Sequence, residues 1–334
     1  TLDKAEVALI HDEKMRIDAE GTLLDVPFKL GASGGSFNQI LTGEPWPIEI
    51  SADGGGARLH VKGAMAGSGD SAGANLNMDL SGKNIGGLAA WLGASPSEKL
   101  SYALNGKLIL TGQNWEMNSL SAHLGKTKLK GQLGWKPGDH HPLLTAKLRL
   151  ENVDPAELGS MVANAETPKK ESGAEGFTFD MPIMPQTVKF DDADIDIGIN
   201  RIQLRKFDMT SVSLTSRIRD GWVEKSPFQA TVKDVRFKGE LSLDLRSKVP
   251  EFKFKIDSSK VDIGMLLAGL NIAEGIDADV GSFGLDLFIK GSNLRTILDQ
   301  SEFAARMKDG NWTIRDPNTN ARLQIRILEC VVKA

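Results

Sequence analysis

Apolar and polar residues alternate strictly in the stretch LSLDLR at residues 241–246. Successive side chains of a β-strand point to opposite faces of the sheet, so this pattern predicts a strand with one apolar and one solvated face. The same alternation recurs at residues 75–80, 146–151, 194–199, 252–257 and 285–290. Parallel sheets that are covered on both sides read instead as continuous apolar runs. The chain is therefore predicted to be mainly β, an elongated, curved antiparallel β-sheet that is groove-like or folded over.

Short apolar stretches follow three of these strands and predict a few short helices, at residues 84–92, 153–162 and 261–270. In the second stretch Asp154 suits the N-cap and Pro155 the first helical position. A fourth short helix is expected at residues 293–299. Each of the first three stretches, together with the strand before it, is a copy of one repeated unit. The copies are unequally spaced, which favours an elongating sheet with occasional helices over a regular solenoid.

Residues 164–186 have low hydrophobicity and no periodicity, because charged and small residues dominate them. Such a segment is typical of a linker, although a long loop in a β protein can also carry function. The segment divides the chain into an N-terminal β-rich region at residues 1–163 and a C-terminal β-rich region at residues 187–334.

Composition narrows the classes of function. The 40 Lys and Arg residues against 44 Asp and Glu give a net charge of −4, without the basic footprint of a nucleic-acid binder, so no nucleic-acid partner is expected. The single cysteine, Cys330, excludes an internal disulfide framework and a cysteine metal site. No run approaches the roughly 18 apolar residues that a membrane-spanning helix requires.

No catalytic or cofactor motif stands out, so neither an enzyme nor a bound cofactor is expected. The glycines at residues 54–56 favour a hairpin turn over a phosphate-binding loop. His140 and His141 are adjacent, so on an extended chain they face opposite ways and make a poor metal site. The aspartates at residues 191–196 flank alternating isoleucines and are predicted to form the wet face of a strand.

The apolar faces of the predicted strands allow two interpretations. They form an ordinary core if they close on one another or lie beneath helices. The expected helices are few and short, however, and an apolar surface that stays uncovered usually marks a binding surface. Acyl chains suit such a surface because they need no hydrogen bonds from the lining. The residues alone leave both interpretations open.

Several segments resemble the AsmA family, and their order along the chain carries the resemblance. In the first half they are DAEGTL at residues 18–23, PFKL at 27–30, PWPI at 45–48, LSGKN at 80–84, YALNGKL at 102–108 and LKGQL at 129–133. In the second half they are MP at 184–185, DADIDI at 192–197, VDIGML at 261–266, GSNL at 291–294 and DGNW at 309–312. Around residues 235–239 the family pattern has a glycine pair, whereas only Gly239 stands here.

The AsmA resemblance implies a periplasmic protein of a Gram-negative bacterium, anchored to the inner membrane by a helix upstream of Thr1. It also implies a part in outer-membrane biogenesis, with phospholipid held along a curved β-sheet groove. The family offers no catalytic motif to transfer. These implications favour the groove interpretation of the apolar faces.

The main hypothesis is therefore a periplasmic lipid-binding or lipid-transfer module whose partners are phospholipids or other membrane lipids. The residues expected to line the groove are Leu148, Leu150, Ile195, Ile197, Leu241, Leu243, Phe252, Phe254, Leu285 and Leu287. The alternative is a non-enzymatic structural or assembly factor of the envelope, which docks other envelope proteins through exposed strand edges.

Overall fold

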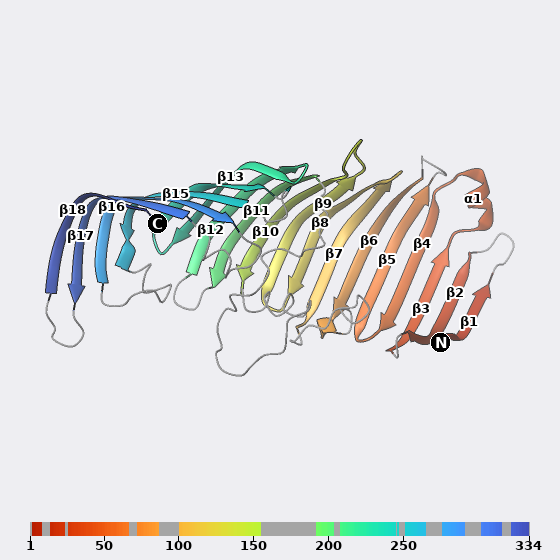
Figure 1. Ribbon diagram of the computed structural model, residues 1–334. Helices are drawn as coiled ribbons and strands as arrows, with labels where there is room; N and C mark the ends of the chain where they lie inside the picture. Colours follow the sequence, from red (N-terminus) through yellow and green to blue (C-terminus); the bar gives the residue numbers. More distant parts are fainter. Residues whose placement is uncertain are drawn as a thin grey trace. The chain divides into compact units, whose positions relative to one another are not determined.

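Strands make up nearly all of the chain that the computed structural model describes (Figure 1). The described residues are 2–8, 14–23, 26–66, 72–86, 100–154, 192–203, 208–244, 246, 251–264, 276–290, 302–315 and 322–333. The chain divides into two units, which we call unit 1 (Thr1–Glu171) and unit 2 (Ser172–Ala334). Their boundary falls within the predicted linker at residues 164–186. That segment lies outside the described residues, so its role as linker or loop stays a prediction.

Unit 1 is an antiparallel meander with one short helix. Its described elements are β1 (Leu2–Ala8), β2 (Arg16–Leu23), β3 (Val26–Gly34), α1 (Phe37–Thr42), β4 (Trp46–Gly54), β5 (Ala57–Ala66), β6 (Gly73–Gly82), β7 (Tyr102–Thr111), β8 (Asn114–Leu124), β9 (Thr127–Lys136) and β10 (Leu143–Val153). Each strand pairs with the next one along the chain. The predicted glycine hairpin is confirmed: Gly54 pairs with Ala57, and both intervening glycines have positive φ.

Unit 2 is a second antiparallel meander. Its described elements are β11 (Asp192–Gln203), β12 (Asp208–Arg219), β13 (Trp222–Val232), β14 (Val235–Asp244), β15 (Glu251–Asp262), β16 (Ile276–Lys290), β17 (Glu302–Arg315) and β18 (Arg322–Lys333). Within the unit, each strand again pairs with its successor. Among the described strands of unit 2, β18 pairs with β17 alone.

A row of interruptions in the pairing crosses strands β15 to β18. The pairing skips one residue in each of these strands, namely Lys260, Gly281, Asp309 and Leu328. Lys260 and Asp309 have φ values of 55° and 53°, in the left-handed region that L-residues rarely adopt. The skipped residues lie directly opposite one another, so the register is the same on both sides of the row. Register shifts of the kind that a bulge causes occur elsewhere, between β7 and β8 and between β12 and β13. Figure 1 shows that β17 and β18 are curved.

The buried apolar cluster of unit 2 lies around this row. Its members are Val232, Phe237, Val261, Ile263, Ala278, Val280 and Met307. Val261 and Ala278 are fully buried, and both residues lie beyond the skipped positions of their strands. Elsewhere in the described strands, most large apolar side chains stay half-buried.

The helix α1 begins at a capping box. Ser36 Oγ accepts a hydrogen bond from the Gln39 amide at 3.4 Å, and Gln39 Oε1 accepts one from the Ser36 amide at 3.0 Å. Gly43 ends the helix with a φ of 73°. The sequence contains the signal for this helix start, because Ser followed three residues later by Gln is the pattern of a capping box. The sequence analysis predicted no helix at these residues.

The predicted mainly β fold with antiparallel strands is confirmed. The described residues of the six alternating stretches lie in β6, β10, β11, β14, β15 and β16, except Arg246, which follows the end of β14. The predicted helix at residues 293–299 lies outside the described residues, and the other three are described only where they begin. There Ile85 and Ile263 are helical, whereas Val153 is the last residue of β10.

Candidate functional site

The apolar side chains of unit 1 gather on one face of its sheet. Directly opposed residues of neighbouring strands point to the same side, so the pairing register arranges them in rows that cross the strands. The central row consists of Ala19, Leu30, Ala52, Leu59, Leu80, Leu104, Ala122, Leu129 and Leu150. We call the surface formed by this row and its parallel rows the apolar face of unit 1.

Two margin rows bound this face at opposite ends of the strands. One, the tyrosine row, consists of Gly21, Phe28, Gly54, Ala57, Gly82, Tyr102, Leu124 and Thr127. The other, the tryptophan row, consists of Trp46, Met65, Ala74, Leu110, Trp115, Trp135 and Leu144. Among the described residues of unit 1, these two rows and the rows between them contain no charged side chain.

The side chains in the middle of the apolar face are half-buried. Leu80, Leu104 and Leu129 belong to this class, whereas Asp79 and Lys130, which point to the opposite face, are exposed. Residues beneath a complete second layer are usually buried outright. The leucines are thus packed against their neighbours within the face, and part of each side chain remains accessible.

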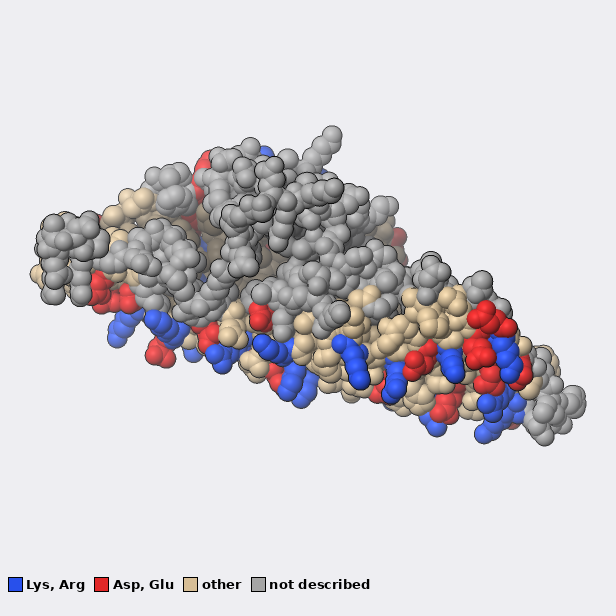
Figure 2. All heavy atoms as spheres, turned by 90° about the horizontal axis from the view of Figure 1, so that it is seen from below, with Lys and Arg blue, Asp and Glu red and all other residues tan. Residues whose placement is uncertain are grey.

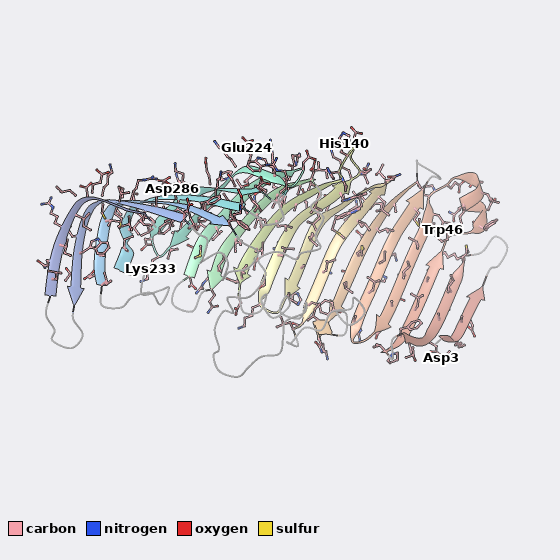
Figure 3. The ribbon with its side chains drawn as sticks, in the orientation of Figure 1. Asp3, Trp46, His140, Glu224, Lys233 and Asp286 are labelled. Carbon is pink, nitrogen blue, oxygen red and sulfur yellow. The ribbon has the colours of Figure 1, made fainter. Side chains whose placement is uncertain are left out.

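Two aromatic rings of the margin rows lie over glycines. A Cβ atom added to Gly34 would come 2.1 Å from Cζ2 of Trp46, whose position beside α1 can be followed in Figure 3. A Cβ atom added to Gly82 would come 2.6 Å from Cε1 of Tyr102. In both places the missing side chain leaves room for a ring to lie flat on the sheet.

Two hydroxyl groups of the tyrosine row are buried without a hydrogen-bond partner. They are Tyr102 Oη and Thr127 Oγ1, and each side chain is only 6% exposed. Burial also raises the pKa of Tyr102 above its ordinary value. Buried polar groups in proteins are nearly always hydrogen-bonded, so these two hydroxyls need an explanation.

The tryptophan row is the wetter margin of the apolar face. Its three indoles are half-buried, and Met65 is 41% exposed. The adjoining helix α1 presents the apolar residues Phe37, Ile40 and Leu41, which are 60%, 49% and 71% exposed. Exposed apolar side chains are thus concentrated near this margin.

Eight of the ten residues predicted to line a groove lie together on one face of unit 2. The register joins Leu241, Phe254 and Leu287 in one row, and Leu243 and Phe252 in the next. Ile195, Ile197 and Leu285 occupy the same face on β11 and β16. The two remaining residues, Leu148 and Leu150, lie on the apolar face of unit 1, opposite Gly131 and Leu129.

These ten side chains differ in exposure. Nine are half-buried, whereas Leu243 is only 7% exposed and is packed into the sheet. Sequence reasoning missed Phe228, whose ring stacks on that of Phe254 with centroids 4.6 Å apart and planes 7° apart. It also missed the Ser226 hydroxyl, which lies fully buried in the same face and donates to Ser216 Oγ at 2.8 Å. Both contacts depend on the register between β12, β13, β14 and β15.

The opposite face of each unit is polar and carries cross-strand ion pairs. Glu49 Oε1 lies 3.1 Å from His60 Nε2 and Glu49 Oε2 lies 3.3 Å from Lys62 Nζ, and these hydrogen bonds lower the pKa of Glu49. In unit 2, Arg306 lies 2.7 Å from Asp286. Figure 2 shows positive and negative side chains interspersed on the described surface that faces the viewer. Exposed pairs of this kind contribute little stability and mainly keep the face hydrated.

The hollows found on the described surface lie mostly on the polar faces. One in unit 2 has a volume of about 600 Å³ and includes Lys253 and Asp286 in its lining. One in unit 1 has a volume of about 360 Å³ and includes Asp53, Arg58 and His60. Opposite charges face each other across these hollows, as expected for the corrugated, solvated side of a sheet. The lining of the hollow in unit 2 also includes Phe254 and Leu287 of the apolar row.

The polar residues that could have suggested chemistry are dispersed. His140 and His141 are exposed in the loop between β9 and β10, where Figure 3 labels His140. Asp194 pairs with Arg219 at 2.8 Å on the face opposite the isoleucines. Within the described ranges, no group of three or more His, Cys, Asp or Glu residues could hold a metal ion.

The comparisons with protein-family models, curated proteins and solved structures returned no match. In the described part of the chain, no helix has the length and apolar character needed to cross a membrane.

Proposed function

We propose that this chain is a non-enzymatic lipid-binding or lipid-transfer module, which holds acyl chains against the apolar faces of its sheets. The observation that carries the proposal is the apolar face of unit 1. It extends over the described strands β2 to β10, contains no charged side chain, and leaves its central leucines half-exposed. An uncovered apolar surface beyond a few hundred Å² usually binds a ligand, a membrane or another protein.

Acyl chains suit this face better than a polar ligand does. A hydrocarbon chain asks for no hydrogen bonds, and each methylene transferred from water contributes about 0.8 kcal/mol. A polar or charged ligand would lose hydration against leucine side chains without receiving a partner in return. The exposed apolar residues of α1 and the half-buried indoles of the tryptophan row also suit a lipid, because tryptophan favours boundaries between apolar and wet surroundings.

The bacterial envelope is the setting that we propose. The resemblance to the AsmA family supports a periplasmic location, an inner-membrane anchor in the full-length protein, and a role in outer-membrane biogenesis. Under this proposal the natural ligands are phospholipids or other membrane lipids, and the polar faces of the sheets meet water.

The test compares two charged substitutions in one strand. Leu148→Asp places a carboxylate on the apolar face, whereas Lys147→Asp places one on the exposed polar face of the same strand. Purified protein is incubated with vesicles containing a fluorescent phospholipid, separated from them, and assayed for bound lipid. We expect Leu148→Asp to lower uptake roughly tenfold or more, because an unpaired carboxylate against hydrocarbon costs more than about 1.4 kcal/mol. Lys147→Asp should take up as much lipid as the wild type.

Circular dichroism and the unfolding midpoint establish whether the variants keep their fold. Undiminished uptake by a folded Leu148→Asp variant would remove the apolar face of unit 1 from the binding surface. A wild-type chain that neither carries lipid by native mass spectrometry nor takes it up from vesicles would refute the proposal itself.

Docking of envelope proteins through strand edges is the second candidate, and the edge of β18 favours it. Five large apolar residues of this strand are exposed, namely Leu323, Ile325, Leu328, Val331 and Val332. An unpaired strand offers its backbone N–H and C=O groups to an incoming strand, and natural proteins usually protect such edges. This function predicts protein partners and no bound lipid, so native mass spectrometry separates the two candidates.

A further inference from the structure

Tyr102 is the only tyrosine of the chain, and it opens β7 in the tyrosine row. Its ring lies over Gly82, so that its hydroxyl sits on the apolar face, close to the backbone of the last residue of β6. A phenylalanine would fill the same space. The hydroxyl adds a buried donor that no described residue satisfies, and such groups are normally paired. A partner outside the chain would explain it.

The surroundings of Tyr102 restrict the chemistry of this partner. No Lys or Arg lies in the described rows of the apolar face of unit 1, so an anionic phosphate would be desolvated there without a counter-charge. The partner must accept the hydrogen bond of the Tyr102 hydroxyl and must carry no charge. A neutral acceptor that is joined directly to hydrocarbon meets both conditions. The ester carbonyl of an acyl lipid is such a group, because its oxygen accepts a hydrogen bond and its chain continues as methylenes.

The dimensions of the face agree with this placement. From Tyr102 the apolar residues of β7 continue through Leu104 and Leu108 to Leu110. The eight residue-to-residue steps from Tyr102 to Leu110 span about 27 Å at the usual rise of a strand. The acyl chains of one membrane leaflet fill about 15 Å, half of the hydrocarbon core of a bilayer. A chain that starts at the tyrosine row can therefore lie along the strands entirely on apolar surface.

We propose that the Tyr102 hydroxyl donates a hydrogen bond to an ester carbonyl of a bound acyl lipid, whose chain extends along the strands toward the tryptophan row. The inference rests on the proposed function and adds the orientation of the lipid and the linkage that is recognised. Thr127, the second unpartnered hydroxyl of this row, gives the same margin a further polar group. The headgroup then lies beyond the tyrosine row, away from the leucines.

The test is a double-mutant cycle. The protein loses the Tyr102 hydroxyl, the lipid loses its ester carbonyl, and the two losses are made separately and together. The affinities of wild-type and Tyr102→Phe protein are measured for diacyl phosphatidylcholine and for its dialkyl ether analogue of equal chain length. Tyr102→Phe should weaken diacyl binding about three- to tenfold, the range expected for one hydrogen bond, and leave dialkyl binding unchanged. A loss that is equal for both lipids, or no loss for either, overturns the proposal.

A spectroscopic arm uses the uniqueness of Tyr102. Protein labelled with 3-fluorotyrosine has one fluorine signal, and this signal should move more with the diacyl lipid than with the dialkyl lipid. Equal shifts count against a bond to the carbonyl. If the wild type binds neither lipid, the proposed function fails; if it binds both equally well and Tyr102→Phe behaves identically, only the carbonyl contact fails. The unfolding midpoint without lipid shows whether the variant is folded, which we expect because the ring is retained.

Discussion

At the scale of single residues, close approach between neighbouring strands decides which positions tolerate a side chain. A Cβ atom added to Gly131 would lie 2.1 Å from the backbone oxygen of Lys147, and one added to Gly63 would lie 1.9 Å from that of Asn75. Real Cβ atoms do not come so close to a carbonyl oxygen, so these glycines set the spacing of the strands. The backbone would have to move to accept alanine there.

Gly131→Ala is expected to lower the free energy of unfolding by about 1–3 kcal/mol, the usual cost of overpacking. Gly31→Ala is the matched control in β3, because its Cβ atom would meet only side-chain atoms, namely the Ser51 hydroxyl at 3.1 Å and Asp18 Oδ1 at 3.7 Å. That hydroxyl can turn aside, and we expect no loss of stability from this change. Urea unfolding of the two variants makes the comparison. Equal midpoints would show that β9 and β10 separate at little cost.

The carboxyl group of Asp244 provides a pH-dependent test. Hydrogen bonds from Arg246 lower the pKa of Asp244 from 3.8 to about 2. A lowered pKa in the folded state favours the ionised form, so the pair stabilises the fold above pH 3.8 and this contribution disappears as the pH falls toward 2. Arg246→Gln should return the pKa of Asp244 toward 3.8, as followed by carbon-13 NMR of the carboxyl group. The pair is exposed, and a pKa that stays near 2 in the variant would assign the shift to another cause.

At the scale of elements, a row of skipped residues changes which side chains of β15 are buried. Val261 and Val280 form the first pair beyond the skipped residues Lys260 and Gly281, and both valines are nearly or fully buried. Before the row, the half-buried Phe254 and Ile256 occupy even-numbered positions, whereas the buried Val261 occupies an odd-numbered one. The alternation therefore changes phase at Lys260, whose φ is positive, without a change of register.

Lys260→Val should destabilise the protein by about 1–2 kcal/mol, because a β-branched residue adopts positive φ poorly. Lys260→Gly is expected to be neutral or slightly stabilising, since glycine adopts a φ of 55° without strain. Thermal unfolding of both variants gives the comparison. If glycine destabilises the protein as much as valine does, the backbone conformation of Lys260 is not the reason.

At the scale of the molecule, each unit has an apolar face, a polar face and few described residues that cover either. Among the described residues, Val261, Ser226 and Ala278 stand out as fully buried, and all three belong to unit 2. Ordinary domains bury their apolar faces between layers. A sheet that leaves such a face half-exposed gains less stability from its core, which is consistent with a surface kept for binding.

The edge of β18 gives a prediction at this scale. We expect the wild type to self-associate with rising concentration, because Leu323 and Leu328 are 58% and 70% exposed on a strand that pairs with β17 alone among the described strands of unit 2. The double substitution of both leucines by lysine should reduce this association, as measured by analytical ultracentrifugation. Leu41→Lys is the control, since Leu41 is 71% exposed on α1, away from any strand edge. Equal effects of both changes would attribute association to general apolar exposure.

The positions of the strands, and the face to which each side chain points, could be predicted from the sequence. The reason is that the alternation of apolar and polar residues with a period of two is a local pattern. Stretches such as residues 252–257 predicted strands, and they predicted correctly that Phe252 and Phe254 point the same way. The capping box at residues 36–39 was equally local but was overlooked between two alternating segments. The polar character of the aspartates around Asp194 also followed from their alternation with isoleucines.

The tertiary structure decided which of these residues meet, because register depends on pairing between distant segments and shifts at each bulge. It buried Leu243 while leaving its predicted partners half-exposed, stacked Phe254 on Phe228, and laid Tyr102 over Gly82. None of these contacts has a signature in the sequence. The sequence thus determined that the strands have an apolar and a polar side, whereas the pairing of the strands determined where that apolar side is closed and where it remains open.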